Sequence, residues 1–236
     1  KNFKPELYYA IVSRAETNGE IIELTSKKKF SKDEMAAAQA LCDAYNAETA
    51  IVTEVKRKKD TLAPGKLYSL SKLQNVLGKR YKMSMADSLA IVQKLYEEGY
   101  VTYPRTNSEY LATAEEDKIR QILSNVEKIG YPVVMKKKKT IFDDSKIESH
   151  SALTPTYKIP DKNRLSSDEM KVYSTIFRRF VAVFCSEDCI VDRTEIKIAV
   201  GELETFTLKG MVIREKGWTK YDDYSAKDKV LPKLSK

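Results

Sequence analysis

A tyrosine and an arginine two residues apart are the side chains in this sequence best suited to phosphate chemistry. Tyr103 is followed directly by Pro104 and Arg105. Proline fixes its own φ at about −65° and biases the preceding residue toward extended backbone, so the phenol would lie on a rigid turn. The Arg105 guanidinium stays charged and can donate two parallel hydrogen bonds to phosphate oxygens. A phenol held beside it could act as a covalent nucleophile toward a phosphate.

Residue types alone do not single out Tyr103. The chain contains 14 tyrosines, and most tyrosines bury their rings in a core or an interface. The Thr-Tyr-Pro-Arg motif is therefore a hypothesis that needs support from other segments.

Two helices are expected to position the tyrosine. The first begins at Ser69 or Ser71 and ends at Arg80, and the second is capped by Ser84 and ended by Gly99. The next four residues form a short extended segment that contains the tyrosine. Two helices followed by a short strand are typical of a winged helix-turn-helix, which would place the phenol near a DNA-facing surface.

Segments rich in β-forming residues stand at both ends of the chain. Residues 1–28 predict a hairpin whose turn is Asn18-Gly19, and residues 50–56 predict another strand. Residues 191–221 return to strands. Their expected turns are Val200-Gly201 and Lys209-Gly210.

Three further helices follow from caps and apolar periodicity. One begins at Ser31, where Glu34 completes a capping box, and one begins at Thr113 with Glu116 in the same role. A long amphipathic helix covers residues 167–184. The arrangement predicts an α+β fold.

Pro64-Gly65 marks the expected domain boundary. Residues 1–66 and 191–236 would form one discontinuous β-rich domain, and residues 67–190 would form an inserted helical, winged-helix-like domain that carries Tyr103.

The composition indicates a folded chain with a hydrophobic core, and its charge suits a polyanionic partner. The 236 residues carry 42 basic and 34 acidic side chains, a net charge of +8, and are 42% hydrophobic. No apolar run approaches the roughly 18 residues that a membrane span needs. The lysine-rich runs 56–59 and 136–139 could be solvated loops or arms that contact phosphates.

The three cysteines do not predict a disulfide framework or a zinc site. Cys185 and Cys189 lie four residues apart and lack the further ligands that zinc needs. Together with Cys42 they are better explained as structural thiols in a reducing cytosol.

Several further segments of the chain support the hypothesis that Tyr103 is a nucleophile. Residues 98–108, which contain the tyrosine, closely resemble the active-site segment of type IA DNA topoisomerases, and their Tyr-Pro-Arg-Thr form is most similar to the topoisomerase III branch. A His-x-Ala-hydrophobic-x-Pro-Thr pattern of the same family occupies residues 150–156. Residues 67–74 resemble the segment that opens the family's helical domain. Further similar regions are 178–180 and 217–218.

The resemblance implies a transesterification on DNA. Tyr103 would attack a backbone phosphorus, keep the 5′ phosphate of the cut strand while another strand passes, and then allow resealing. Arg105 would stabilise charge on the phosphate oxygens. His150, the only histidine, would contact a DNA phosphate or assist proton movement. Asn107, also expected at the DNA, stands where the family usually carries aspartate, and an amide supplies a hydrogen-bond acceptor without charge.

The resemblance also implies cofactors, partners and location. The β-rich domain would be a hinge whose motion opens a gate for DNA, with single-stranded DNA as the preferred partner. The enzyme would be a cytoplasmic monomer of the bacterial nucleoid and would not use ATP. No Gly-x-x-x-x-Gly-Lys-Ser/Thr loop occurs in the sequence.

Catalytic Mg²⁺ in the family is held by an Asp-x-Asp-x-Glu cluster on a Toprim domain that precedes this region. The sequence contains no such cluster, so this chain is expected to bind no catalytic metal and to cleave DNA poorly alone. It begins at Lys1 within a strand-like segment, as expected of a piece of a longer protein.

Two other functions remain open at this point. Residues 67–105 could be the winged helix of a sequence-specific regulator, which would bind duplex sites tightly. A tyrosine recombinase would keep the 3′ phosphate instead. It would also place its histidine ahead of the tyrosine, whereas His150 follows Tyr103.

Overall fold

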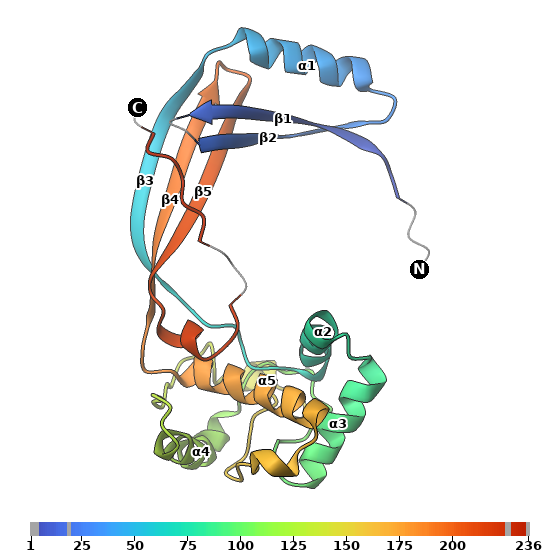
Figure 1. Ribbon diagram of the computed structural model, residues 1–236, viewed down its shortest axis with the longest axis vertical. Coiled ribbons are helices and arrows are strands. Elements are labelled where there is room, and N and C mark those ends of the chain that lie inside the picture. Colours follow the sequence, from blue (N-terminus) through green and yellow to red (C-terminus); the bar gives the residue numbers. More distant parts are fainter. Residues whose placement is uncertain (1–4, 18–19, 225–227, 235–236) are drawn as a thin grey trace. The chain divides into compact units, whose positions relative to one another are not determined.

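The computed structural model describes residues 5–17, 20–224 and 228–234 (Figure 1). The chain has an α+β fold, as the sequence predicts, and divides into two compact units. The β-rich unit comprises residues 1–60, 191–214 and 226–236. The helical unit comprises residues 61–190 and 215–225. Among the described residues, no helix is long and apolar enough to cross a membrane.

An antiparallel hairpin and one helix form the first part of the β-rich unit. The hairpin consists of β1 (Tyr8–Thr17) and β2 (Glu20–Ser31), with an irregularity in register between Ala10 and Val12. The predicted Asn18-Gly19 turn lies outside the described residues. Figure 1 shows α1 (Met35–Ala47) lying along this hairpin.

The predicted start of the first helix at Ser31 is wrong. Ser31 is the last residue of β2, and α1 begins at Met35 after a tight turn. Glu34 nevertheless makes half of the expected capping box, because its Oε2 accepts a hydrogen bond from the Ser31 backbone N–H at 2.8 Å. This hydrogen bond stabilises the tight turn between β2 and α1 and does not cap the helix.

A second sheet has the order β3-β4-β5. Its strands are β3 (Ala50–Leu62), β4 (Cys189–Val200) and β5 (Glu204–Glu215). The expected turn at Val200-Gly201 is present, and Gly201 has a left-handed φ of +49°.

The expected turn at Lys209-Gly210 is wrong, because both residues lie inside β5. The Gly210 backbone is approached so closely that a Cβ atom there would lie 2.7 Å from the Lys229 carbonyl oxygen. Glycine thus marks a close backbone contact with the segment 228–234, not a chain reversal.

Glu204 joins the hairpin, α1 and the second sheet. Its carboxylate accepts hydrogen bonds from Ser26 Oγ at 2.7 Å, from the Lys27 backbone N–H at 2.9 Å and from Tyr45 Oη at 2.5 Å. Burial raises the pKa of Glu204, but the three hydrogen bonds outweigh it, and the pKa lies below its usual value. The apolar core around this junction contains Ile22, Ile196, Ile198 and Leu208.

The described residues of the helical unit form four α-helices and four short 3-10 helices. The α-helices are α2 (Leu70–Tyr81), α3 (Met85–Glu97), α4 (Glu116–Lys128) and α5 (Ser167–Phe184). The 3-10 helices are η1 (Thr113–Glu115), η2 (Asp144–Lys146), η3 (Lys162–Arg164) and η4 (Gly217–Lys220). Residues 217–220 therefore form a helical turn where the sequence predicted strand.

Of two caps predicted in this unit, one is confirmed and one is wrong. Ser84 caps α3 as predicted, since its Oγ accepts a hydrogen bond from the Asp87 backbone N–H at 3.0 Å. The predicted box at Thr113 and Glu116 is wrong. Glu115 instead accepts from the Ala112 backbone N–H at 3.3 Å, and Glu116 forms an ion pair with Lys137.

The longest helix, α5, is the centre of the helical core, and its predicted bounds are confirmed. Phe180 and Phe184 on this helix are fully buried and pack with their rings 4.9 Å apart. Cys185 and Cys189 after it are free and buried, and burial raises the pKa of both thiols. The reading of these cysteines as structural thiols fits their burial.

The helical unit also holds the chain segments beside its borders. The Trp218 Nε1–H donates to the Leu62 carbonyl at 2.7 Å. Arg179 on α5 donates to the Asp222 carboxylate at 2.5 Å and to the Lys66 carbonyl at 2.9 Å. Residues 61–66 and 215–225, which the sequence assigned to the β-rich part, therefore pack with the helices.

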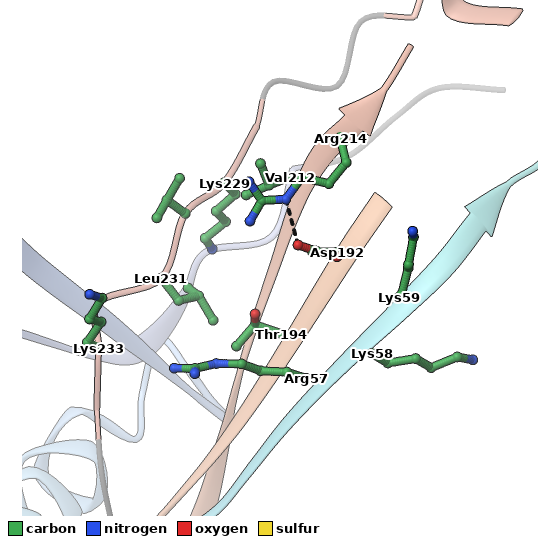
Figure 2. A pocket seen from close by; sticks show the side chains of 11 residues that line it. Arg57, Lys58, Lys59, Asp192, Thr194, Val212, Arg214, Lys229, Leu231 and Lys233 are labelled. Atoms are coloured by element: carbon green, nitrogen blue, oxygen red, sulfur yellow. Dashed lines mark hydrogen bonds and ion pairs between the residues drawn. The ribbon is translucent and has the colours of Figure 1, made fainter. Parts of the chain in front are cut away.

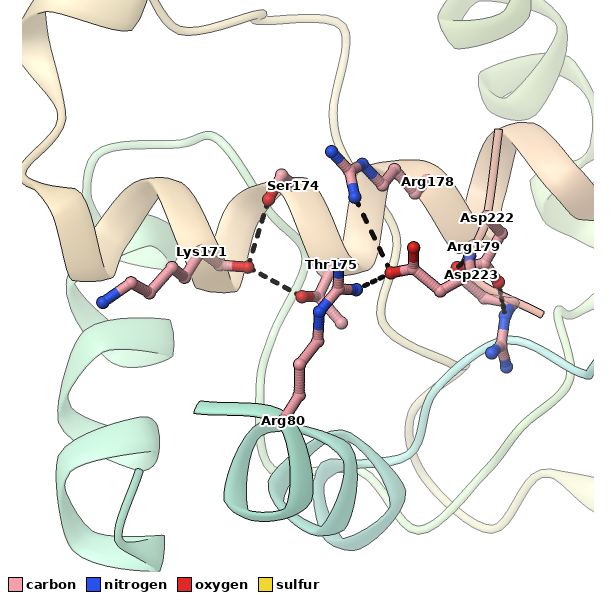
Figure 3. A network of polar contacts seen from close by, with 8 residues as sticks. All are labelled: Arg80, Lys171, Ser174, Thr175, Arg178, Arg179, Asp222 and Asp223. Carbon is pink, nitrogen blue, oxygen red and sulfur yellow. Dashed lines mark hydrogen bonds and ion pairs between the residues drawn. The ribbon is translucent and has the colours of Figure 1, made fainter. Parts of the chain in front are cut away.

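Figure 3 shows a second set of ionic contacts beside the Arg179–Asp222 pair. The Asp223 carboxylate forms an ion pair with Arg80 of α2 and lies 3.7 Å from Arg178 of α5. The segment after η4 is thereby attached to two helices.

Candidate active site

The tyrosine segment leaves α3 through a glycine and then pairs with a distant part of the chain. Gly99 has a φ of +78°, which ends the helix. Val101 forms an antiparallel bridge with Pro155, and the Thr102 backbone N–H donates to the Thr154 carbonyl at 3.0 Å. The extended segment before Tyr103 therefore lies beside the block that begins with His150.

The third block, residues 67–74, joins the same junction. Tyr68 forms an antiparallel bridge with Leu153, and the Leu70 backbone N–H donates to the Thr106 carbonyl at 3.0 Å. Tyr68 and Leu153 are both buried. Three segments that are far apart in the sequence thus fix the backbone around the tyrosine.

Two buried hydroxyls, which the sequence reading did not select, fix the loop that follows Arg105. Thr106 Oγ1 donates to the His150 carbonyl at 2.9 Å and accepts from the Ser108 backbone N–H at 3.1 Å. Ser108 Oγ in turn donates to the Lys146 carbonyl at 3.0 Å. Small polar residues directly after a candidate motif were the only signal for this role.

The Tyr103 ring is half-buried between two other rings. Its centroid lies 4.5 Å from that of His150, with the planes inclined at 45°. The Tyr96 ring meets it edge-on at 5.5 Å. The Tyr103 hydroxyl makes no hydrogen bond to another described residue, so its oxygen is available to a ligand.

Residues of the loop that follows Tyr103 line a small polar pocket. Its volume is about 100 Å³, and it is lined by Arg105, Asn107, Ser108, Lys146, Glu148, Ser149 and His150. The structure therefore brings together Arg105, Asn107 and His150, which the sequence had selected. Tyr103 does not line the pocket and reaches this group through its contact with the His150 ring.

The charges of the pocket suit an anion better than a metal ion. Arg105 and Lys146 contribute two cations, and Glu148 contributes the only carboxylate. The exposed Arg105 side chain forms no ion pair with a carboxylate of the described chain. Mg²⁺ favours sites with carboxylates and phosphate oxygens, and a single carboxylate beside two cations does not fit it. In the described ranges, no three His, Cys, Asp or Glu side chains could hold a metal together.

Asn107 is exposed and lies in this pocket beside Arg105. Its amide can exchange hydrogen bonds with a bound phosphate or with the arginine but cannot attract either by charge. The sequence did not predict Lys146, which stands alone and carries no signal comparable to the lysine run at 136–139.

That lysine run is attached to the helical unit. Lys137 pairs with Glu116, and the Lys138 carbonyl accepts from the Ile141 N–H at 2.8 Å. Burial lowers the pKa of the half-buried Lys136. Residues 136–138 are therefore held by contacts within the fold, unlike a free arm.

Known proteins are similar to this chain over its whole length. The whole chain, residues 1–236, matches a protein-family model described as DNA topoisomerase. It is 32% identical to DNA topoisomerase 3 of Bacillus licheniformis, over 100% of this chain and 34% of that protein. It is 31% identical to DNA topoisomerase 3 of Bacillus subtilis, over 99% of this chain and 34% of that protein. The chain thus spans about a third of the length of these curated relatives.

The fold is also similar to a solved structure. Full-length topoisomerase I from Thermotoga maritima superposes with a TM-score of 0.64 at 21% identity, over 98% of this chain and 38% of that one. Because the family match runs from the first residue to the last and the fold agrees with it, the chain belongs to the type IA DNA topoisomerase family.

Proposed function

We propose that this chain carries the nucleophile of a type IA topoisomerase and holds one DNA strand covalently during strand passage. The Tyr103 oxygen attacks a backbone phosphorus and forms a tyrosyl O–P bond. The bond from phosphorus to the 3′ oxygen of the preceding sugar breaks. The phenol loses its proton, and the departing 3′ oxygen gains one. The reverse reaction reseals the strand, so no ATP is needed.

The observation that carries this proposal is the contact between Tyr103 and His150, at 4.5 Å between ring centroids, beside a small pocket that contains Arg105. A tyrosine must lose its proton from a reference pKa of about 10 as it attacks. The His150 imidazole, which lies against the Tyr103 ring, could pass a proton or contact the phosphate.

Arg105 and Asn107 have supporting roles in this proposal. The guanidinium would bind the phosphate oxygens, on which charge grows in the transition state. The Asn107 amide would contact the DNA from the same pocket. Both side chains are exposed, as binding to a polymer requires.

The catalytic metal ion would be bound by another part of the parent enzyme. We place Mg²⁺ on a Toprim domain outside this chain, where it would position the phosphate and the departing oxygen. The 236-residue chain alone would then bind single-stranded DNA as a monomer in the cytoplasm but form little covalent complex. Its β-rich unit would act as the hinge and its helical unit as the moving part of a gate.

The direct test is transfer of a label from DNA to protein. The chain, with its N-terminal and C-terminal flanks restored, is incubated with Mg²⁺ and single-stranded oligonucleotides labelled at either end, and then denatured. We expect transfer from the 3′-labelled strand, because the tyrosine keeps the 5′ phosphate of the downstream piece. Transfer from the 5′-labelled strand only would indicate recombinase polarity, and no transfer with tight duplex binding would indicate a winged-helix regulator.

A further inference from the structure

One face of the β3-β4-β5 sheet is apolar at one end and basic at the other. Alternate residues of a strand point to the same face. On β4, Ile196 and Ile198 lie in the core, whereas Asp192 and Thr194 line an open pocket of about 420 Å³. On β5, Arg214 lies at this basic end. The whole pocket belongs to the β-rich unit.

Several cationic side chains and, among the described residues, a single carboxylate, Asp192, line this pocket, called here the basic pocket. The cations are Arg57, Lys59, Arg214, Lys229 and Lys233. Lys58 borders the pocket from the same face of β3 as Lys56 and pairs with Asp60 at 3.8 Å. Figure 2 shows Arg57 extending from β3 toward the C-terminal segment and Arg214 turned toward Asp192. The Arg214–Asp192 ion pair, at 2.6 Å, neutralises the carboxylate and leaves the pocket strongly positive.

The C-terminal side of the basic pocket is fixed by backbone contacts. The Met211 N–H donates to the Lys229 carbonyl at 3.0 Å, and the Lys229 N–H donates back at 2.9 Å. The Asp228 carboxylate accepts from the Ile213 N–H at 3.0 Å. Lys229 is therefore presented from an ordered edge of the sheet.

We infer that the basic pocket binds the phosphodiester backbone of a nucleic-acid strand. Like charges gathered around one neutralised carboxylate repel one another, and phosphates placed among them would relieve that repulsion. The Thr194 hydroxyl can donate to a phosphate oxygen, and Val212 and Leu231 offer apolar contacts to a sugar. Contacts of this kind recognise the backbone and not the base sequence.

This inference deepens the proposed function and rests on it, since it adds a second DNA contact to the chain that carries Tyr103. The cleavage site lies in the helical unit, and the basic pocket lies in the β-rich unit. A strand held there would be bound independently of the covalent step.

The test compares neighbouring cations on opposite faces of β3. Binding of the 236-residue chain to a fluorescent oligo-dT strand is measured by anisotropy over a range of salt concentrations. Arg57→Gln and Lys229→Gln each remove a charge that lines the pocket. The control, Lys56→Gln, removes a charge next to Arg57 but on the other face. Glu54, which pairs with Lys56, keeps its ion pair with Lys197 at 2.7 Å.

We expect each pocket variant to weaken binding about fivefold, the effect of losing one charge-assisted contact. Each should also reduce the slope of log K against log salt by about 0.7. The control should change Kd by less than about twofold, as expected for an exposed charge away from the ligand. Oligo-dA should give the same pattern as oligo-dT.

Equal losses of oligonucleotide affinity in Arg57→Gln and Lys56→Gln would overturn the inference, because net charge alone would then explain binding. So would displacement of the oligonucleotide by thymidine monophosphate at equal phosphate concentration, which would indicate a site for small anions. Label transfer by the flank-restored enzyme is measured separately. If transfer occurs and the pocket variants bind normally, only this inference fails, whereas absent transfer would refute the proposed function alone.

Discussion

At the residue scale, the proposed chemistry requires a phenol, an imidazole and a guanidinium to lie close together. Tyr103 contacts the His150 ring, and Arg105 shares a small pocket with His150. Neither arrangement follows from spacing along the chain, because His150 is brought in by backbone pairing between residues 101–102 and 154–155.

Replacement of Arg105 should slow DNA cleavage without unfolding the protein. Arg105→Ala removes the proposed phosphate contact, and loss of one such donor costs about 100-fold in rate. Arg105→Lys keeps the charge but loses the bidentate geometry, so its rate should be intermediate. Single-turnover cleavage by the flank-restored enzyme measures both. A rate within twofold of wild type in the alanine variant would contradict the role.

Asn107→Asp should lower the fraction of enzyme found in the covalent complex. The new carboxylate would lie in the pocket beside Arg105, where it would compete with the DNA phosphate for the guanidinium and repel it. The fraction is measured by denaturing the reaction at equilibrium, with cleavage and resealing rates followed separately. Asn107→Ser is the uncharged control. Unchanged rates for both steps in the aspartate variant would remove the idea that charge at this position matters.

At the element scale, each unit contains a polar junction: the Arg179–Asp222 pair in the helical unit and Glu204 in the β-rich unit. Arg179 is largely buried and pairs with Asp222, which is only 7% exposed. It also lies 4.5 Å from the centre of the Tyr68 ring. Arg178, one residue earlier, is exposed and lies 3.7 Å from Asp223.

Arg179→Ala should lower the free energy of unfolding by about 3 kcal/mol, because it leaves the Asp222 carboxylate buried without a partner. Arg178→Ala should cost less than about 1 kcal/mol, as exposed ion pairs usually do. Urea denaturation followed by the fluorescence of Trp218, which lies in the same unit, measures both. Similar losses in the two variants would show that burial of the pair is unimportant.

Glu204→Gln should destabilise the β-rich unit by about 1–2 kcal/mol near neutral pH, since it weakens three hydrogen bonds to a carboxylate. The folded-state pKa of Glu204 is lowered from 4.5, so its stabilisation is present above that pH and is lost as pH falls through the folded value. The difference from wild type should therefore shrink in acid. Circular dichroism melts at several pH values measure it.

The matched control is Glu202→Gln, which makes the same change at an exposed residue in the turn between β4 and β5. It should leave Tm unchanged at every pH. A pH-independent loss in Glu204→Gln would mean that shape, not charge, holds the junction.

Elements with local signals could be predicted from the sequence, and contacts across the chain could not. Residues 167–184 match α5 at both ends because an apolar stripe and the Ser166 cap are encoded locally. Gly210 was misread as a turn because its reason for being glycine is the Lys229 backbone, 19 residues later. Thr106 is a small polar residue after the motif, but nothing local to it identifies the His150 carbonyl, 44 residues later, as its partner.

At the scale of the whole molecule, two compact units share one chain that passes between them more than once. Residues 61–66 and 215–224 pack with the helices because Arg179 and Trp218 bind them there. The Pro64-Gly65 signal lies a few residues after that border, because these contacts connect residues far apart in the sequence. The division into a hinge and a gate remains a proposal about how the units serve the parent enzyme.

The most direct test of the central claim identifies which tyrosine becomes linked to DNA. The flank-restored enzyme is trapped on a single-stranded oligonucleotide, digested with nuclease and trypsin, and analysed by mass spectrometry. Trypsin releases residues 95–105, which contain Tyr96, Tyr100 and Tyr103, so fragment ions distinguish the three. Tyr103→Phe should abolish the adduct, and Tyr96→Phe, which alters the neighbouring ring, should retain it. The account predicts a nucleotide 5′ phosphate on Tyr103, and an adduct on any other residue would contradict it.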